Sequence, residues 1–205
     1  MTEPISGMVL AGGKSRRLGA DKTRLILAGG RSLLQASVDL LNQVVQEVLV
    51  VVGAESETEV TGARIVHDVY PDKGSLGGIY SGLLSCQHEH CLVVGCDMPF
   101  LNVGFLKWMV ERPRDYDVLI PRLDGHLEPL HAIYSKRCLP HMRALLDQGD
   151  LKILDFFDQV VVKYVEADEV DRWDPERLSF FNVNTPENLA RAREIIARRG
   201  EGTGD

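Results

Sequence analysis

The sequence contains no apolar run long enough to cross a membrane, because its longest runs fall far short of the ~20 residues that a spanning helix needs. It also lacks a basic segment followed by a long apolar stretch near Met1, so no secretory signal is expected. These absences lead us to expect a cytoplasmic protein with no membrane partner.

Closely spaced cysteine pairs are also absent, since Cys86, Cys91, Cys96 and Cys138 form no Cys-x-x-Cys motif. Cys91 and Cys96 flank an apolar run that we predict to be a buried strand. Buried, reduced thiols are the favoured interpretation for a cytosolic chain, ahead of a zinc site or a catalytic thiol. The six histidines show no metal-ligand spacing supported by a third ligand, so we interpret them as surface or hydrogen-bonded core residues.

Positive charge is in deficit, because 23 Lys and Arg against 30 Asp and Glu give a formal net charge of −7. General nucleic-acid binding needs clustered basic residues that neutralise phosphates, and this balance argues against it. A small phosphorylated ligand is compatible with the sequence, because local charge and not the sum decides such binding.

The remaining composition is that of one globular domain. The chain has 205 residues, of which 44% are hydrophobic and 26% charged. We find no internal repeat and no linker rich in Pro, Gly and Ser. We therefore predict a single domain over residues 1–199 and a disordered tail at 200–205.

Short β-branched runs alternate with amphipathic stretches along the chain. The pattern predicts strands at 5–10, 48–52, 64–67, 91–95, 118–120, 132–134 and 160–165, and helices at 33–45, 76–86, 105–110, 140–146 and from 186 onward. Strands separated by helices indicate βαβ units. The expected fold class is therefore α/β, with a mostly parallel sheet and helices on both faces.

The first predicted strand runs into Ala11-Gly12-Gly13 and then into a basic segment with Arg16, Arg17 and Lys22. Glycines let backbone N–H groups approach phosphate oxygens, and the basic side chains add the charge that a triphosphate needs. Neither GxxxxGK[ST] nor GxGxxG is present. A lone Gly-Gly after a strand is more often a surface turn, but the whole segment favours phosphate binding.

Two aspartates lie just past the ends of predicted strands. Asp97 follows the strand at 91–95, and Asp68 follows the strand at 64–67. Ligands of open α/β sheets bind at the carboxyl ends of the strands, where a carboxylate can hold Mg²⁺ against nucleotide phosphates. Taken alone, each aspartate is more often a helix cap or a turn former.

Two further segments lie at predicted helix starts. In the segment FNVNTPE, Asn182 and Asn184 alternate, so we expect both side chains on one side of an extended strand. Thr185 and Pro186 suit the cap and first position of the last helix. The segment GSLGG at 74–78 is, on its own, a helix entry turn.

Together these segments resemble the motifs of the molybdenum cofactor guanylyltransferase family. LAGGKSRRLGADK at 10–22 resembles LAGGxSxRMGxDK, GSLGGI at 74–79 resembles GPLAG, CDMP at 96–99 matches CDxP, and FNVNTPE at 181–187 resembles FxNxNTPE. The resemblance extends from Leu10 to Leu189. The cytidylyl relative of this family normally carries Ala-Ala-Gly, so Ala11-Gly12-Gly13 favours GTP over CTP.

The resemblance implies a single-domain, Rossmann-like nucleotidyltransferase fold. It also implies transfer of GMP from GTP to molybdopterin with release of pyrophosphate, Mg²⁺ as cofactor, and transient contact with cofactor-delivery proteins or molybdoenzymes. The implied nucleotide-binding residues are Leu10, Ala11, Gly12, Gly13, Arg16, Lys22, Asp68 and Asp97. The implied catalytic residues are Arg17, Lys22 and Asp97, with Asp97 as the metal ligand. The implied pterin-side residues are Gly74, Leu76, Gly78, Asn182 and Asn184, and Glu128-Pro129-Leu130 resembles the family's acceptor-side segment.

The sequence departs from the family pattern at Ser75 and Gly77, which affect rigidity more than chemistry, and at Gly53, which affects base contact. Ser75 replaces Pro and Gly77 replaces Ala, and both changes loosen the backbone. Gly53 stands where the family often has an Asn that contacts the guanine or the ribose. Base contact at that point must therefore come from the backbone, or be missing.

Two other functions stay open at this point. One is a molybdopterin cytidylyltransferase, or another transferase that uses CTP or UTP and a different phosphorylated acceptor. The other is a non-catalytic module that binds GTP and delivers the molybdenum cofactor, which would release no pyrophosphate.

We expect Asp97→Ala and Lys22→Ala each to lower the rate of pyrophosphate release by about a hundredfold or more, because each removes charge that stabilises the transferring phosphate. Circular dichroism should show that both variants stay folded. Near-normal turnover by either variant would contradict its assigned role.

Overall fold

The protein is described by a computed structural model that covers residues 3–12, 25–27 and 30–201. The strands are β1 Ser6–Leu10, β2 Glu47–Val52, β3 Arg64–His67, β4 His90–Gly95, β5 Val118–Leu123, β6 His126–Leu127, β7 His131–Ser135 and β8 Val162–Glu166. The helices are α1 Leu33–Leu41, α2 Gly74–Ser85, α3 Val103–Val110, α4 Leu139–Gln148, α5 Ala167–Asp171 and α6 Pro186–Glu201.

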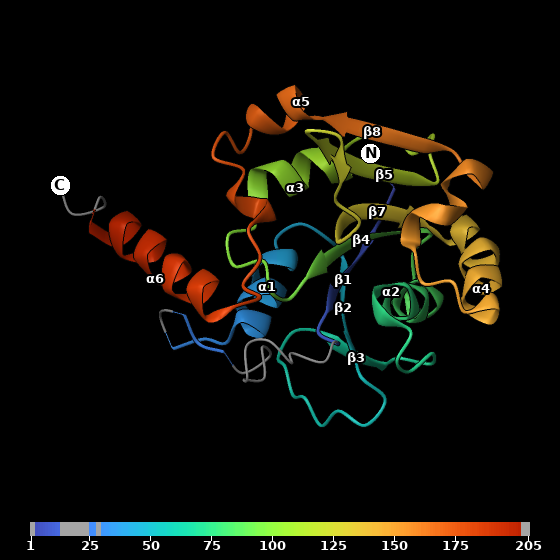
Figure 1. Ribbon diagram of the computed structural model, residues 1–205, viewed down its shortest axis with the longest axis horizontal. Coiled ribbons are helices and arrows are strands. Elements are labelled where there is room, and N and C mark those ends of the chain that lie inside the picture. Colours follow the sequence, from blue (N-terminus) through green and yellow to red (C-terminus); the bar gives the residue numbers. More distant parts are fainter. Residues whose placement is uncertain (1–2, 13–24, 28–29, 202–205) are drawn as a thin grey trace.

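All eight strands join one sheet in the order β3-β2-β1-β4-β7-β5-β6, with β8 paired to β5. The four strands from β3 to β4 are parallel, whereas β7 is antiparallel to both β4 and β5. Helices α2 and α4 cover one face and helices α1 and α3 the other, while α6 extends away from the sheet (Figure 1). The predicted α/β class with helices on both faces is confirmed.

Apolar side chains alternate between two buried layers along the central strands. Val9, Val50 and Val94 face the cluster under α1 and α3, whereas Met8 and Val51 face the cluster under α2 and α4. A strand covered on both faces can be apolar at every position, which explains the continuous runs at 48–52 and 91–95.

Glycine at one face of α2 lets that helix pack directly on the sheet. A Cβ atom added at Gly82 would lie 2.6 Å from the sulfur of Met8 and 2.9 Å from Val51. At Gly78 the added atom would meet Leu10 at 3.4 Å. The glycines of this helix therefore set the distance between α2 and the strands β1 and β2.

The predicted helix at 33–45 is too long. Helix α1 ends at Leu41 with Asn42 as its cap, and the backbone N–H groups of Val44 and Val45 both donate to Leu41 O in the following turn. Val44 and Val45 are buried although they are not helical. Their spacing therefore indicated that they face the core, but not that the helix continues to them. At the other end of the chain, α6 continues to Glu201, and residues 202–205 lie outside the described part.

The hairpin that joins β5 to β6 was not predicted. Its turn residues Asp124 and Gly125 have positive φ values of 50° and 83°, as a two-residue Asp-Gly turn requires. The Asp-Gly pair was the available sequence signal. Within the described ranges, every helix is too short or too polar to span a bilayer.

The buried thiols were predicted correctly, but one histidine differs from expectation. All four cysteines are free and buried. His131 is fully buried at the start of β7. The centroid of its ring lies 5.4 Å from that of Phe105 and 4.7 Å from that of Phe180. Neither of its ring nitrogens has a hydrogen-bond partner among the described residues, so it is a core histidine that is not hydrogen-bonded.

This environment makes stability depend on pH. Burial lowers the pKa of His131 from its usual 6.5 to about 4, and nearby Asp174 opposes the shift. Between these two pH values only the unfolded chain binds the proton, so the free energy of unfolding falls as the pH drops through this interval.

We expect His131→Phe to remove this dependence, because phenylalanine keeps a ring in the stack and cannot titrate. Between pH 6.5 and pH 4 the variant should lose up to about 3 kcal/mol less stability than the wild-type chain. Urea unfolding at a series of pH values measures both curves. Parallel curves would contradict this account.

Candidate functional site

The carboxyl ends of three parallel strands lie at one level. Leu10, the last residue of β1, is opposite Val51 of β2 and Gly95 of β4. The pairing continues past the strand ends, since Ala11 N donates to Val51 O (2.8 Å) and Cys96 N donates to Leu10 O (3.1 Å). The segments that leave these strands therefore begin side by side, at the edge where ligands of such sheets bind.

The described part of the glycine-rich segment lies at the centre of this edge. Leu10 is buried, Ala11 is half-buried and Gly12 is exposed. A Cβ atom added at Gly12 would lie 3.7 Å from the backbone nitrogen of Gly53. Gly13, Arg16, Arg17 and Lys22 lie outside the described residues, so their roles remain predictions.

Asp97 is half-buried at the end of β4, beside the glycine-rich segment. Its side chain folds back over Gly95, so that a Cβ atom added there would lie 2.6 Å from Asp97 Oδ1. Val183 N donates to Asp97 O (2.9 Å), and this bond holds the backbone of the turn. The carboxylate therefore occupies space that only a glycine at position 95 leaves open.

A carboxylate in this place fits a divalent cation such as Mg²⁺, which prefers oxygen ligands and is often bound by one or two carboxylates together with substrate phosphates. In the described ranges no three His, Cys, Asp or Glu side chains form a metal-binding group. A cation held by Asp97 would thus share its coordination sphere with phosphate oxygens and water.

Asp68 follows β3 and is engaged in a local turn. Its Oδ1 accepts hydrogen bonds from Tyr70 N (2.9 Å) and from the Ser81 hydroxyl (2.7 Å), and its own N–H donates to Val52 O. The structure therefore gives Asp68 the turn-forming role that its residue type alone suggests. Its contact with the nucleotide remains a prediction.

The start of α2 contributes a positive helix end to the same edge. Gly74 is exposed and has φ +62°, and the first turn contains no acidic residue and no side-chain cap. The uncapped N–H groups and the helix dipole favour an anion here. Leu76 is fully buried and Gly78 packs against Leu10, so both contribute packing, and their proximity to the pterin remains a prediction.

The segment with Asn182 and Asn184 lies next to Asp97 but is not a strand. One backbone bond, from Val183 to Asp97, joins it to the site, and Val183 is fully buried. Asn182 Nδ2 donates to Phe180 O (3.0 Å), and Asn184 is exposed. The prediction of a strand is therefore wrong, because a single bond does not form a ladder. The expectation that the side chains of Asn182 and Asn184 lie on one side stays a prediction. The prediction that Thr185 caps α6 is confirmed by its bond from Asn188 N (3.2 Å).

The segment at 128–130 shows a feature that its sequence did not reveal. Glu128 is half-buried, and burial raises the pKa of its carboxyl group, while His126 opposes the shift. Tyr134 Oη donates to Pro129 O (2.9 Å) and holds the segment over β7. A half-buried carboxyl group on the expected acceptor side is a candidate functional residue.

Comparison with known proteins gives one consistent family. A family model described as "MobA-like NTP transferase domain" matches residues 7–163. A probable molybdenum cofactor guanylyltransferase of Pelotomaculum thermopropionicum is 37% identical, with 96% of each chain covered. A molybdenum cofactor guanylyltransferase of Desulfosudis oleivorans is 31% identical, over 95% of this chain and 96% of the other.

Among solved structures, the molybdopterin-guanine dinucleotide biosynthesis protein A of Archaeoglobus fulgidus has a similar fold. Its TM-score is 0.82 at 30% sequence identity, and the match covers 94% of this chain and 99% of that protein. Sequence and structure therefore point to the same relatives.

Because the Asp97 carboxylate depends on the space above Gly95, we expect Gly95→Ala to displace it and to lower turnover by about tenfold to a hundredfold. The stability cost of Gly95→Ala should be smaller in an Asp97→Ala background, where the clashing oxygens are gone. Pyrophosphate release and urea unfolding of the four chains measure both effects. A wild-type rate for Gly95→Ala would contradict the assigned contact.

Proposed function

The chain belongs to the family of MobA-like NTP transferases, and from this premise we propose that it is a molybdenum cofactor guanylyltransferase. It is a nucleotidyltransferase, and its substrates are GTP and molybdopterin. The observation that carries the proposal is the common level of Leu10, Val51 and Gly95, because it brings the glycine-rich segment and Asp97 to one edge.

The reaction is an in-line displacement at phosphorus. An oxygen of the terminal phosphate of molybdopterin attacks the α-phosphorus of GTP, and a new P–O bond forms. The bond between the α-phosphorus and the bridging oxygen breaks, and the electron pair leaves with pyrophosphate. Such transfers depend on positioning and on neutralising phosphate charge, and they require no covalent intermediate with a side chain.

The residues divide these tasks. The backbone N–H groups after β1 bind phosphate oxygens, and Arg17, Lys22 and Arg16 neutralise the triphosphate. Asp97 holds Mg²⁺, which when bound polarises the phosphates. We assign Asn182 and Asn184 to the molybdopterin side, and the backbone bond from Val183 N to Asp97 O supports this by joining their segment to the site.

We expect only GTP to support pyrophosphate release when the purified chain is incubated with molybdopterin, Mg²⁺ and each of GTP, CTP, UTP and ATP. The chain should also make the guanine dinucleotide form of the cofactor, which mass spectrometry identifies. Turnover with CTP in place of GTP would indicate the cytidylyl alternative. GTP binding without pyrophosphate would indicate a non-catalytic carrier.

A further inference from the structure

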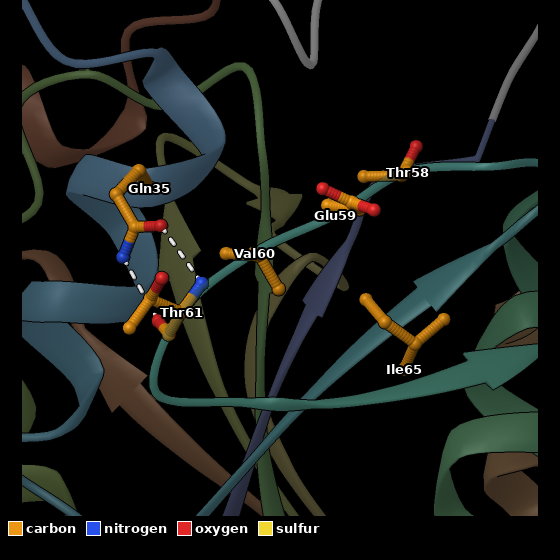
Figure 2. Close-up of a pocket in the computed structure, with 6 residues that line it drawn as sticks. All are labelled: Gln35, Thr58, Glu59, Val60, Thr61 and Ile65. Atoms are coloured by element: carbon orange, nitrogen blue, oxygen red, sulfur yellow. Dashed lines mark hydrogen bonds between the residues drawn. The ribbon is translucent and has the colours of Figure 1, made fainter.

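An open hollow of about 570 Å³ lies between α1 and the segment that joins β2 to β3. Its lining residues are Gln35, Thr58, Glu59, Val60, Thr61 and Ile65. Figure 2 shows Gln35 and Thr61 together on one side, Thr58 and Glu59 on the other, and Val60 between them. The hollow thus combines an apolar wall with a rim that carries a hydroxyl group and a carboxylate.

Side-chain amides hold the wall of this hollow in place. Gln35 Nε2 donates to Thr61 O (2.9 Å), and Gln35 Oε1 accepts from Thr61 N (3.0 Å), the two dashed bonds in Figure 2. Asn42 Nδ2 donates to Gly62 O (3.0 Å), one residue further along. The side-chain amides of α1 and its cap therefore bond the backbone of the joining segment, where a neighbouring strand would otherwise do so.

The rim of the hollow is connected to the nucleotide edge by a short path. A Cβ atom added at Gly12 would lie 3.7 Å from Gly53 N, and Ser56 N donates to Gly53 O (3.0 Å) in the next turn. The hydroxyl groups of Ser56 and Thr58 lie 2.7 Å apart, and Glu59 follows. Because β2 and β3 lie on the side of β1 away from β4, the hollow is on the side of the glycine-rich segment opposite to Asp97. A nucleotide that crosses the glycine-rich segment away from Asp97 would bring its base to this side of the edge.

We propose that this hollow receives the guanine ring of GTP and that the Glu59 carboxylate recognises the ring through its N1–H and 2-amino groups. The inference rests on the proposed function and adds a specificity residue to it. The two carboxylate oxygens accept from two adjacent donors, while Val60 and Ile65 contact the face of the ring. Glu59 is exposed and has no hydrogen-bond or ion-pair partner among the described residues, so its oxygens can meet a ligand.

This arrangement selects guanine by both attraction and repulsion. Guanine presents two neighbouring donors on its pairing edge, whereas adenine and cytosine each present one donor next to a ring nitrogen lone pair. A carboxylate facing that lone pair would be repelled, which disfavours ATP and CTP. The side chain of Glu59 thus supplies the base contact that Gly53 does not.

The test compares nucleotides that differ only at these donors. Dissociation constants of GTP and ITP are measured by titration calorimetry with Mg²⁺, for the wild-type chain and for Glu59→Gln. Inosine lacks the 2-amino group, so the wild-type chain should bind GTP about tenfold to a hundredfold more tightly than ITP. Glu59→Gln should bring this ratio close to one and should improve XTP binding, because the glutamine amide can donate to the 2-oxo group of xanthine.

Glu57→Gln is the matched control, because Glu57 is an exposed carboxylate of the same segment that does not line the hollow. It should keep the wild-type ratio of GTP to ITP affinity. The proposal is overturned if Glu59→Gln also keeps that ratio, if Glu57→Gln loses it equally, or if the wild-type chain does not distinguish GTP from ITP. Thermal unfolding verifies that both variants are folded.

Because these measurements contain no acceptor, they separate the two proposals. Selective GTP binding that depends on Glu59, without pyrophosphate release in the presence of molybdopterin, would overturn the proposed function alone. Guanylyl transfer with an unchanged ratio in Glu59→Gln would overturn the present inference alone.

Discussion

The structure depends on the parallel pairing of β1 with both β2 and β4. In a parallel ladder the register decides which strand ends are level, and here Leu10, Val51 and Gly95 share one level. A shift by one residue would turn the buried side chains of β1 to the wrong faces, and both core clusters oppose it. The same force that packs the core thus aligns the segments that leave these strands.

Close packing at glycine positions completes the edge. At Gly82 and Gly78 the sheet fills the space that a side chain would take, and this brings the start of α2 near the end of β1. At Gly95 the carboxylate of Asp97 fills that space instead. The glycines of these motifs are therefore explained by packing first, and their contribution to the site follows from the packing.

The order of the strands fixes the order of the segments along this edge of the sheet. From β3 through β2 and β1 to β4, the edge passes from the hollow with Glu59, to the glycine-rich segment, to Asp97, and then to the segment with Asn182. The proposed base site and the proposed acceptor side thus lie toward opposite ends of this edge. The guanosine stays bonded to the α-phosphorus during the transfer, whereas the attacking phosphate and the departing pyrophosphate lie on opposite sides of that phosphorus.

The sequence by itself determined the central strands, the fold class, the buried thiols and the position of Asp97 after β4, because these follow from short-range patterns of apolar residues and glycine. The sequence pattern overestimated the length of α1, because Val44 and Val45 have helical spacing and are buried but lie beyond the end of the helix. Only the tertiary structure decided that residues 181–184 are not a strand, that Asp97 lies over Gly95, and that Glu59 lines a hollow near Gly12. These features depend on contacts between residues far apart in the chain, and no local pattern records such contacts.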